Sequence, residues 1–261
     1  MHFVCMRLKR IGTERYIMEF YDIHSHILAK VDDGAETFEM SCRMLDMAYE
    51  EGIRHLCVTP HYNRHNADDA ERPKKVMRAF RALELYAKKQ YEDMHLYRGN
   101  EVMFFPDMVK YLEGGSITTM NGGRYVLVEY KPNASYHNVY SGLQQILYAG
   151  YLPVLAHVER LDCLIDEWDK LEELKESGII LQMNTDGLIG GRFDRWVRRC
   201  RALVEDGYID VLGTDAHNMS SRPPQYRRAA EWIEKKCGRA RLRQLVEENP
   251  RTILENRLIS T

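Results

Sequence analysis

Short apolar runs alternate with longer amphipathic stretches along most of this chain. The short runs are rich in Val, Ile and Leu and show little period-two alternation, which is typical of parallel strands covered on both faces. The predicted strands span 20–23, 55–59, 95–100, 125–129, 153–156, 179–183 and 211–213. Seven such runs give the chain a regular strand framework.

The stretches between these runs carry apolar residues at helical spacing. Thr37 can cap the first helix, and Gly52, Gly150, Gly178 and Gly207 follow predicted helix ends, where glycine is a common stop signal. The predicted helices span 37–51, 73–92, 136–149, 164–177, 194–206, 224–236, 239–248 and 250–256. Alternating strands and helices imply a parallel sheet, either open or closed.

Potential metal ligands sit at or near the ends of most predicted strands. They are His24, His26, Asp33, His61, Glu101, Glu129, His157, Asp215 and His217. In a barrel the carboxyl ends of all strands meet at one face, whereas an open doubly wound sheet gathers its site at one switch point. The pattern therefore favours an α/β, TIM-like barrel.

No linker, repeat or low-complexity segment divides the chain, so we expect one domain over residues 18–261. Residues 1–17 precede the first strand and are predicted to be an N-terminal extension. Their role is left open between a disordered segment and a short element packed on the barrel.

Composition limits the possible binding partners of the protein and its cellular compartment. The formal net charge is −2, which gives no support for a nucleic-acid surface. No apolar run is long enough to cross a bilayer, and the N-terminus lacks the apolar region of a signal peptide. The six cysteines form no Cys-x-x-Cys pair, as expected of reduced thiols in a cytoplasmic protein. A homo-oligomer stays open.

Two ligand pairs share one spacing. His24 and His26 lie two residues apart near a strand end, as do Asp215 and His217. Side chains at i and i+2 of a strand point to one face, so both members of a pair can meet one ion. A single pair is weak evidence because strands often carry a surface histidine. Two pairs with further ligands between them indicate a metal centre.

Each of the other five ligands has an ordinary alternative reading. His61 suits a loop position, His157 a buried core histidine, and Asp33 a turn carboxylate. Glu101 and Glu129 can form salt bridges, since a carboxylate at the end of a buried strand is costly unless it is paired or ligated. Each alternative is acceptable alone, but the metal centre explains all five together.

On these residues the chain resembles the PHP (polymerase and histidinol phosphatase) superfamily. Within it the chain is most similar to the manganese-dependent bacterial protein-tyrosine phosphatases of capsule and exopolysaccharide operons. The stretches that carry the resemblance are Asp22-Ile-His-Ser-His26, Val31-Asp-Asp-Gly-Ala35, Thr59-Pro-His61, Leu155-Ala-His-Val-Glu-Arg160, Gln182-Met-Asn184, Thr214-Asp-Ala-His217 and Ser221-Arg-Pro-Pro224.

The resemblance implies a distorted (β/α)7 barrel with three divalent metal ions, manganese first and Fe, Zn, Co or Mg as alternatives. By similarity, one ion takes His24, His26, Glu101 and Asp215; a second takes Glu101, Glu129 and His157; the third takes Asp33, His61 and His217. Arg160 and Arg222 match the phosphate-binding arginines. The implied substrate is the phosphotyrosine-bearing tail of a bacterial tyrosine kinase.

Hydrolysis would use hydroxide made from water acidified by the cations, and the two arginines would neutralise the phosphoryl oxygens. Arg160 has alternative partners in Glu129 and Glu159, and Arg222 can instead be a surface residue. The basic run of Arg192, Arg195, Arg198, Arg199 and Arg201 suits a solvated helix face better than a dock for an acidic tail.

Three other functions stay open at this stage. The first is a small-molecule phosphatase of the same fold, resembling a histidinol phosphatase. The second is a cysteine-dependent phosphatase, since Cys237 and Arg243 have the Cys-x5-Arg spacing, although the motif falls in a helical pattern. The third is a metal-stabilised module that binds phosphotyrosine without hydrolysing it.

Overall fold

The computed structural model describes residues 18–191 and 193–259, so the predicted extension over residues 1–17 lies outside the described residues. All paired strands run parallel. The strands are β1 (Phe20–Asp22), β2 (Ile53–Val58), β3 (His61–Tyr62), β4 (His95–Arg98), β5 (Glu101–Met103), β6 (Tyr125–Glu129), β7 (Leu152–Leu155), β8 (Ile180–Asn184) and β9 (Val211–Gly213). They form two sheets, in the orders β1-β2-β4 and β3-β5-β6-β7-β8-β9.

The two sheets are connected through short interruptions in two strands. Val58 pairs with Arg98 and His61 pairs with Glu101, so β3 and β5 keep the register of β2 and β4. Pro60 lies in one interruption because proline has no N–H to donate to a ladder. Asn100 lies in the other and donates from Nδ2 to the Pro60 carbonyl, at 2.8 Å. The predicted strand 95–100 therefore corresponds to β4 alone, and β5, which was not predicted, begins beyond it at Glu101.

The first and last strands also meet. Ser25 and Ala216 form a parallel bridge, and the His26 N–H donates to the Ala216 carbonyl at 2.8 Å. The chain thus has the mixed α/β architecture of a curled parallel sheet with helices on its outside, and the carboxyl ends of β1 and β9 are brought together.

Helices connect most successive strands. They are α1 (Phe38–Glu50), α2 (Arg72–Gln90), α3 (Met108–Glu113), α4 (Tyr136–Tyr148), α5 (Trp168–Glu176), α6 (Arg195–Glu205), α7 (Arg227–Arg243) and α8 (Asn249–Leu254). The predicted cap is confirmed, since the Thr37 hydroxyl accepts from the Met40 N–H. Asp194 caps α6 in the same way. The short α3 was not predicted because its six residues carry too little amphipathic pattern.

The break predicted between the helices 224–236 and 239–248 is confirmed within α7, where Gly238 has non-helical dihedrals, with φ at 86° and ψ at 165°. A π-helical segment, Gln244–Glu248, then leads into α8. None of the described helices combines the length and the apolar character needed to span a bilayer.

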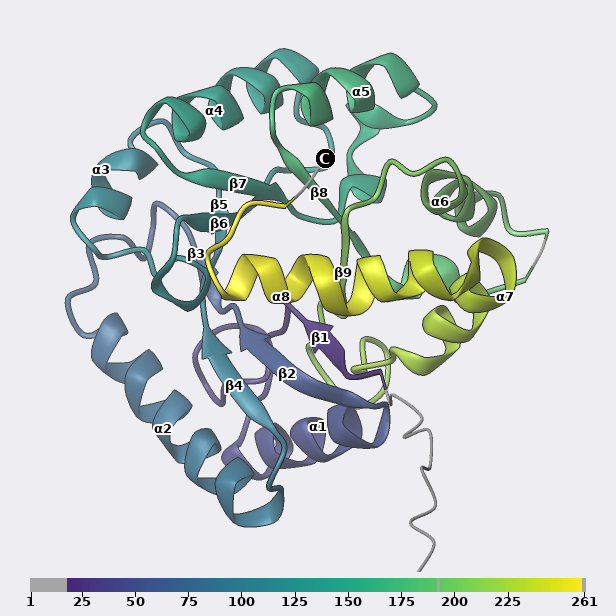
Figure 1. The fold of residues 1–261 in the computed structure, drawn as a ribbon. Coiled ribbons are helices and arrows are strands. Elements are labelled where there is room, and N and C mark those ends of the chain that lie inside the picture. Colours follow the sequence, from purple (N-terminus) through teal and green to yellow (C-terminus); the bar gives the residue numbers. More distant parts are fainter. Residues whose placement is uncertain (1–17, 192, 260–261) are drawn as a thin grey trace, which may run out of the picture.

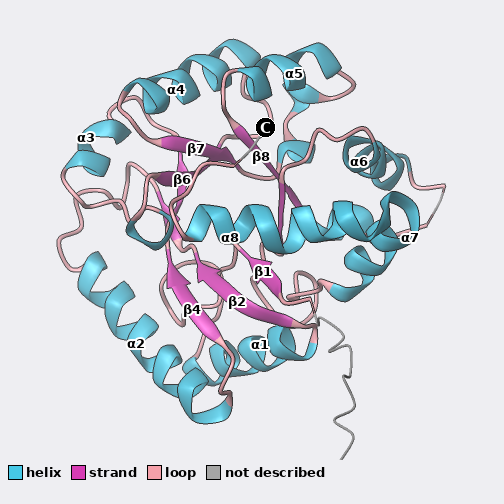
Figure 2. Ribbon diagram, in the orientation of Figure 1, coloured by secondary structure: helices cyan, strands magenta, loops and turns pink. Residues whose placement is uncertain are grey.

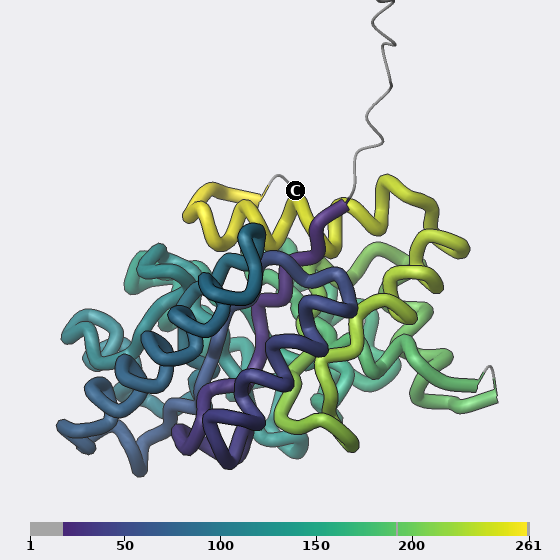
Figure 3. Tube along the Cα trace, turned by 90° about the horizontal axis from the view of Figure 1, so that it is seen from below, coloured from purple at the N-terminus to yellow at the C-terminus, as the bar shows by residue number. Residues whose placement is uncertain are grey.

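The helices surround the strands, and α8 crosses one end of the sheet (Figure 1). Figure 2 shows the strands inside this ring of helices, and Figure 3 places the C-terminal helices at one end of the molecule. Ile253 and Leu254 of α8 pack into a buried apolar cluster with residues of the strands, including Leu127 and Val154. This end of the sheet is closed by apolar packing, so the polar strand ends lie at the other.

Candidate metal centre

The two predicted ligand pairs lie side by side at the carboxyl ends of β1 and β9. The Asp215 N–H donates to the His24 carbonyl at 2.8 Å, which fixes one segment against the other. Gly213 ends β9 where a side chain has no room, since a Cβ there would lie 2.6 Å from the His24 Cβ. The close approach of these two segments therefore depends on glycine at this position.

The other predicted ligands converge on the same place. The His, Asp and Glu side chains form three overlapping groups. Within each group, every residue offers one ligand atom that lies within 4.8 Å of those of the other members. The groups are His26, Asp33, His61 and His217; His24, His26, Glu101 and Asp215; and His61, Glu101 and Glu129. His157 also belongs here, because its Nε2 lies 2.8 Å from Glu101 Oε1 and 3.7 Å from Glu129 Oε2. Residues from strand ends distributed along the chain thus form one cluster.

Glu101 is the central carboxylate of this cluster and is only 1% exposed. Its Oε1 lies 3.1 Å from His24 Nε2, while its Oε2 lies 3.0 Å from both His26 Nε2 and His61 Nδ1. A carboxylate with both oxygens surrounded by imidazoles can bridge adjacent cations. The position of Glu101 at the start of β5 places it at this point.

The members of two ligand groups implied by resemblance stand together in the structure. They are His24, His26, Glu101 and Asp215, and Asp33, His61 and His217, which His26 joins. In the remaining group His61 joins Glu101 and Glu129, with His157 Nε2 beside both carboxylates. His61 lies 3.3 Å from Asp33 but also 3.1 Å from Glu129, so it faces two of the expected groups. The division of the nine side chains among individual ions stays a prediction.

A tenth residue, Asp32, was not among the predicted site residues. Its Oδ2 lies 2.9 Å from His26 Nδ1 and accepts from the His61 N–H at 3.1 Å, and its Oδ1 accepts from the Gly34 N–H. A carboxylate on one imidazole nitrogen leaves the other nitrogen to face a metal. The sequence signal was the pair of carboxylates in Val31-Asp-Asp-Gly, of which only Asp33 was assigned a role.

Two ligand residues have an unusual backbone. His157 has φ at 35° and Asp215 has φ at 51°, in the left-handed region that non-glycine residues rarely adopt. Such strain persists only where surrounding contacts hold it, and it is concentrated at functional sites. Both residues lie two positions past the end of a strand, β7 for His157 and β9 for Asp215, where the turn aims their side chains toward the cluster.

The two predicted arginines converge on one ligand carboxylate. Arg160 Nη1 donates to Asp215 Oδ2 at 2.8 Å, and Arg222 Nη2 donates to the same oxygen at 2.7 Å. Arg160 also lies 3.9 Å from Asp186 rather than pairing with Glu129 or Glu159. Both guanidiniums therefore lie at the edge of this cluster of side chains, and Arg222 is not an isolated surface residue. Their phosphate-binding role stays a prediction.

The charges of the cluster suit cation binding. Burial acts to raise the pKa of Glu101 and Asp215, but the nearby His24 imidazole contributes to holding both values below their usual range. Burial, together with the charge of His26, lowers the pKa of His217 to about 4. Burial also acts to lower the pKa of His26 and His61, but the neighbouring carboxylates raise these values to about 9 and about 11. The carboxylates of the cluster thus hold positive charge between them, and a bound cation would displace the imidazole protons.

Two buried ligand atoms of the cluster, Asp215 Oδ1 and His217 Nε2, form no hydrogen bond within the protein. Asp215 Oδ1 lies 3.5 Å from His24 Nε2, and His217 Nε2 lies 3.4 Å from Asp33 Oδ1. Buried polar atoms are nearly always paired, so unpaired ones among these side chains indicate a ligand. Together with the mixture of imidazole and carboxylate donors, they fit divalent transition-metal ions.

The structure separates the arginines of the basic run into members with structural contacts and exposed members. Arg199 donates to the Glu159 carbonyl at 2.7 Å, and Arg201 donates to the Leu188 carbonyl at 2.9 Å, so both have structural contacts. Arg195 and Arg198 are exposed, and Arg192 lies outside the described residues. This division fits a largely solvated helix face with two inward-pointing members.

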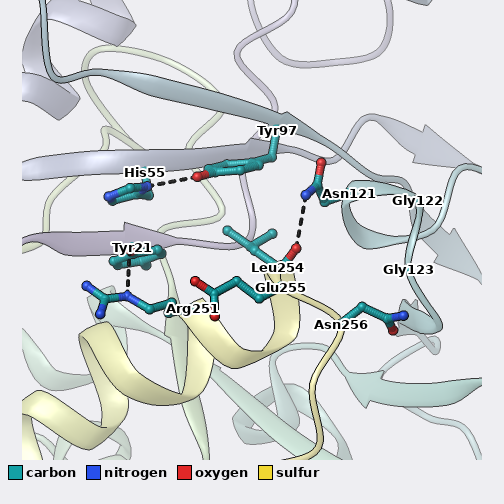
Figure 4. Close-up of a pocket in the computed structure, with 10 residues that line it drawn as sticks. All are labelled: Tyr21, His55, Tyr97, Asn121, Gly122, Gly123, Arg251, Leu254, Glu255 and Asn256. Carbon is teal, nitrogen blue, oxygen red and sulfur yellow. Dashed lines mark hydrogen bonds between the residues drawn. The ribbon is translucent and has the colours of Figure 1, made fainter.

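A separate cavity of about 470 Å³ lies at the other end of the sheet, where α8 packs. Figure 4 shows Tyr21, His55 and Tyr97 of three adjacent strands along one side and Arg251 on the other. Gly122 and Gly123, which precede β6, border it as well. The cavity therefore shares no residue with the nine predicted ligands.

Comparison with known proteins identifies the family of this chain. Residues 20–255 match the family model described as capsular polysaccharide synthesis, CpsB/CapC. The chain belongs to the CpsB/CapC family. Tyrosine-protein phosphatase CpsB of Streptococcus pneumoniae is 33% identical over 243 residues, which cover 91% of this chain and 99% of that protein. Tyrosine-protein phosphatase YwqE of Bacillus subtilis is 30% identical, over 91% of this chain and 92% of that protein.

The fold of the CpsB/CapC family agrees with the architecture described above. A crystal structure from the pair YwqE of Bacillus subtilis and CpsB of Streptococcus pneumoniae matches this chain with a TM-score of 0.83. It is 28% identical and covers 92% of this chain and 96% of that one. The two proteins are described there as metal-dependent tyrosine phosphatases.

Proposed function

We propose that this chain is a metal-dependent protein-tyrosine phosphatase that acts in the control of capsule or exopolysaccharide synthesis. The observation that carries the proposal is the cluster of nine His, Asp and Glu ligands with two guanidiniums at its edge. Family membership supports it, since the CpsB and YwqE relatives bear the name tyrosine-protein phosphatase.

The proposed centre holds three divalent cations, and manganese is the leading candidate for their identity. The ligands are His24, His26, Asp33, His61, Glu101, Glu129, His157, Asp215 and His217. When bound, such cations lower the pKa of water and neutralise phosphoryl oxygens. The overlap of the three ligand groups through His26, His61 and Glu101 supports several closely spaced ions rather than one.

The protein's own residues orient the phosphate. Arg160 and Arg222 lie at one side of the cluster, and a guanidinium can donate paired hydrogen bonds to phosphoryl oxygens. Their common partner Asp215 holds the two guanidiniums beside each other. Donors placed in advance stabilise the charge that develops on the transferring phosphoryl group. Arg160 and Arg222 are thus the proposed catalytic arginines.

Phosphotyrosine suits a site with these components. The phenol of tyrosine has a pKa of roughly 10, so the phenolate leaves with less help from a proton donor than a serine alkoxide needs. We propose the phosphotyrosine-bearing tail of a bacterial tyrosine kinase as the substrate and the cytoplasm as the location.

The strands also support a distorted (β/α)7 barrel over residues 18–261. The pairs β2 and β3, and β4 and β5, keep a common register and can each be counted as one interrupted strand.

Turnover of a phosphotyrosine peptide by chelator-treated and Mn2+-reloaded protein tests the proposal. We expect activity only after reloading, with a higher kcat/KM for the peptide than for histidinol phosphate. Preference for histidinol phosphate would favour the small-molecule phosphatase. Binding of the peptide without turnover by the reloaded protein would favour a non-catalytic module.

A further inference from the structure

The Gln182-Met-Asn184 motif has no role in the ligand set, yet both of its amides are fully buried beside the cluster. Asn184 ends β8, and Gln182 shares one face of that strand with it, because the two lie two residues apart. Gly213 of β9 pairs with Asn184, and a Cβ at Gly213 would lie 3.1 Å from Gln182 Nε2. The neighbouring strand therefore leaves space for these amides.

The contacts of the two amides link three predicted metal ligands. Gln182 Oε1 lies 3.1 Å from His24 Nδ1 and accepts from the His157 N–H at 2.9 Å. Gln182 Nε2 donates to Asn184 Oδ1 at 2.9 Å. Asn184 Nδ2 donates to Asp215 Oδ2, also at 2.9 Å. A continuous chain of hydrogen bonds thus connects His24 and His157 to Asp215.

The donor and acceptor at each step of this series of hydrogen bonds are determined by its two ends. The His157 backbone N–H can only donate, so Gln182 must present its oxygen to it. Its NH2 group then faces Asn184, which must accept and must turn its own NH2 group to the Asp215 carboxylate. Because Gln182 Oε1 accepts, His24 Nδ1 carries a proton, so the neutral, metal-binding form of His24 has its lone pair on Nε2, the atom beside Glu101.

We propose that Gln182 and Asn184 are positioning residues that set the His24 tautomer and fix the orientations of His157 and Asp215 for metal binding. Gln182 fixes His24 in the tautomer that can bind through Nε2 and anchors the strained backbone of His157. Asn184 shares Asp215 Oδ2 with Arg160 and Arg222, so that Oδ1 is left facing the cluster. The inference rests on the proposed metal centre and adds two residues that touch no ion themselves.

Loss of an outer partner of a metal ligand typically costs about 10- to 100-fold in metal affinity. We therefore expect Gln182→Met and Asn184→Leu to weaken Mn2+ binding to the apoprotein by about that factor, measured by isothermal titration calorimetry. Asn249→Leu is the matched control, since this buried amide donates from Nδ2 to the Asp210 carbonyl at 2.8 Å, away from the ligand set. It should bind Mn2+ as the wild type does.

Gln182→Glu separates positioning from simple packing. A glutamate keeps an acceptor for both His24 and His157 but cannot donate to Asn184, so it should retain more Mn2+ affinity than Gln182→Met. Equal affinity of the wild type, Gln182→Met and Asn184→Leu would overturn the inference, as would an equal loss in Asn249→Leu or in Gln182→Glu. A wild-type protein that binds no Mn2+ would instead contradict the proposed metal centre itself.

Discussion

Arg160 donates a hydrogen bond to Asp215 at 2.8 Å, so a predicted phosphate-binding residue holds a predicted metal ligand. Arg222 donates to the same carboxylate oxygen at 2.7 Å. Phosphate binding and metal binding are therefore coupled through one side chain. A change at either arginine is expected to alter both the affinity for phosphate and the geometry of Asp215.

Replacement of Arg222 tests the role of the guanidiniums. Arg222→Ala should lower kcat/KM for a phosphotyrosine peptide by about 10²- to 10³-fold, because a donor to the developing charge is lost. It should also weaken inhibition by inorganic phosphate. Steady-state kinetics with phosphate as inhibitor measure both. Arg195→Ala, at a side chain 88% exposed, is the control, and unchanged kinetics in Arg222→Ala would remove the proposed role.

Replacement of His157 tests the metal ligands. His157→Ala removes a side chain that lies 2.8 Å from Glu101, and we expect loss of activity together with reduced Mn2+ content. Metal analysis by mass spectrometry on the purified variant provides the measurement. His95→Ala is the control, since His95 is exposed on β4 and lies outside the cluster. Near wild-type turnover by His157→Ala would refute its assignment.

Cys237 tests whether a thiol takes part in the reaction. Cys237 and Arg243 both lie within α7, and the Arg243 guanidinium lies 3.1 Å from Glu248, so the pair does not form a phosphate-binding loop. Burial raises the pKa of the Cys237 thiol, which opposes formation of a nucleophilic thiolate. Cys237→Ser should therefore keep full activity; inactivation with an unchanged metal content would restore the cysteine mechanism.

His55 gives a prediction for stability away from the metal cluster. Its nitrogens lie 2.9 Å from the Tyr97 hydroxyl and 3.1 Å from Glu19, and its ring stacks on Tyr21 and faces His95. Burial lowers the pKa of His55, with His95 adding to the effect against the opposing Glu19. The unfolded chain therefore binds a proton more readily than the native protein does.

The sign of the pH dependence follows. Where the unfolded state binds more protons, stability rises with pH. The contribution of neutral His55 is thus present above the unfolded pKa of about 6.5 and is lost as pH falls from that value through the lower pKa of the folded state. His55→Gln should flatten the change in unfolding free energy between about pH 7 and pH 5. Urea unfolding of chelator-treated protein measures it, and an unchanged slope would contradict the assignment.

Much of the fold was predictable because strand residues and helix stops were locally encoded. The apolar run 125–129 matches β6, and Thr37 and Asp194 cap helices as their residue types favour. The resumption of pairing in β3 and β5, beyond the interruptions at Pro60 and Asn100, was not predicted, since it depends on the long-range pairing of His61 with Glu101 and on the contact from the Asn100 side chain to the Pro60 carbonyl. Local pattern does not contain such pairings.

The convergence of the candidate ligands was predictable because His, Asp and Glu residues lay at or near the ends of several predicted strands. Glu101 and His157 each had an ordinary alternative when taken alone, and the structure places them 2.8 Å apart. Asp32 and Gln182 could not be given roles, because an Asp in a turn and a Gln in a strand are ordinary in sequence. Their function depends on which imidazole nitrogens they face, which only the folded structure shows.

Anomalous X-ray diffraction from crystals grown with Mn2+ tests the central claim most directly. We expect anomalous peaks inside the cluster, each with its ion bonded to side chains of the nine predicted ligands and with Glu101 contacting more than one ion. The absence of peaks at saturating Mn2+, or peaks located away from these side chains, would contradict the account.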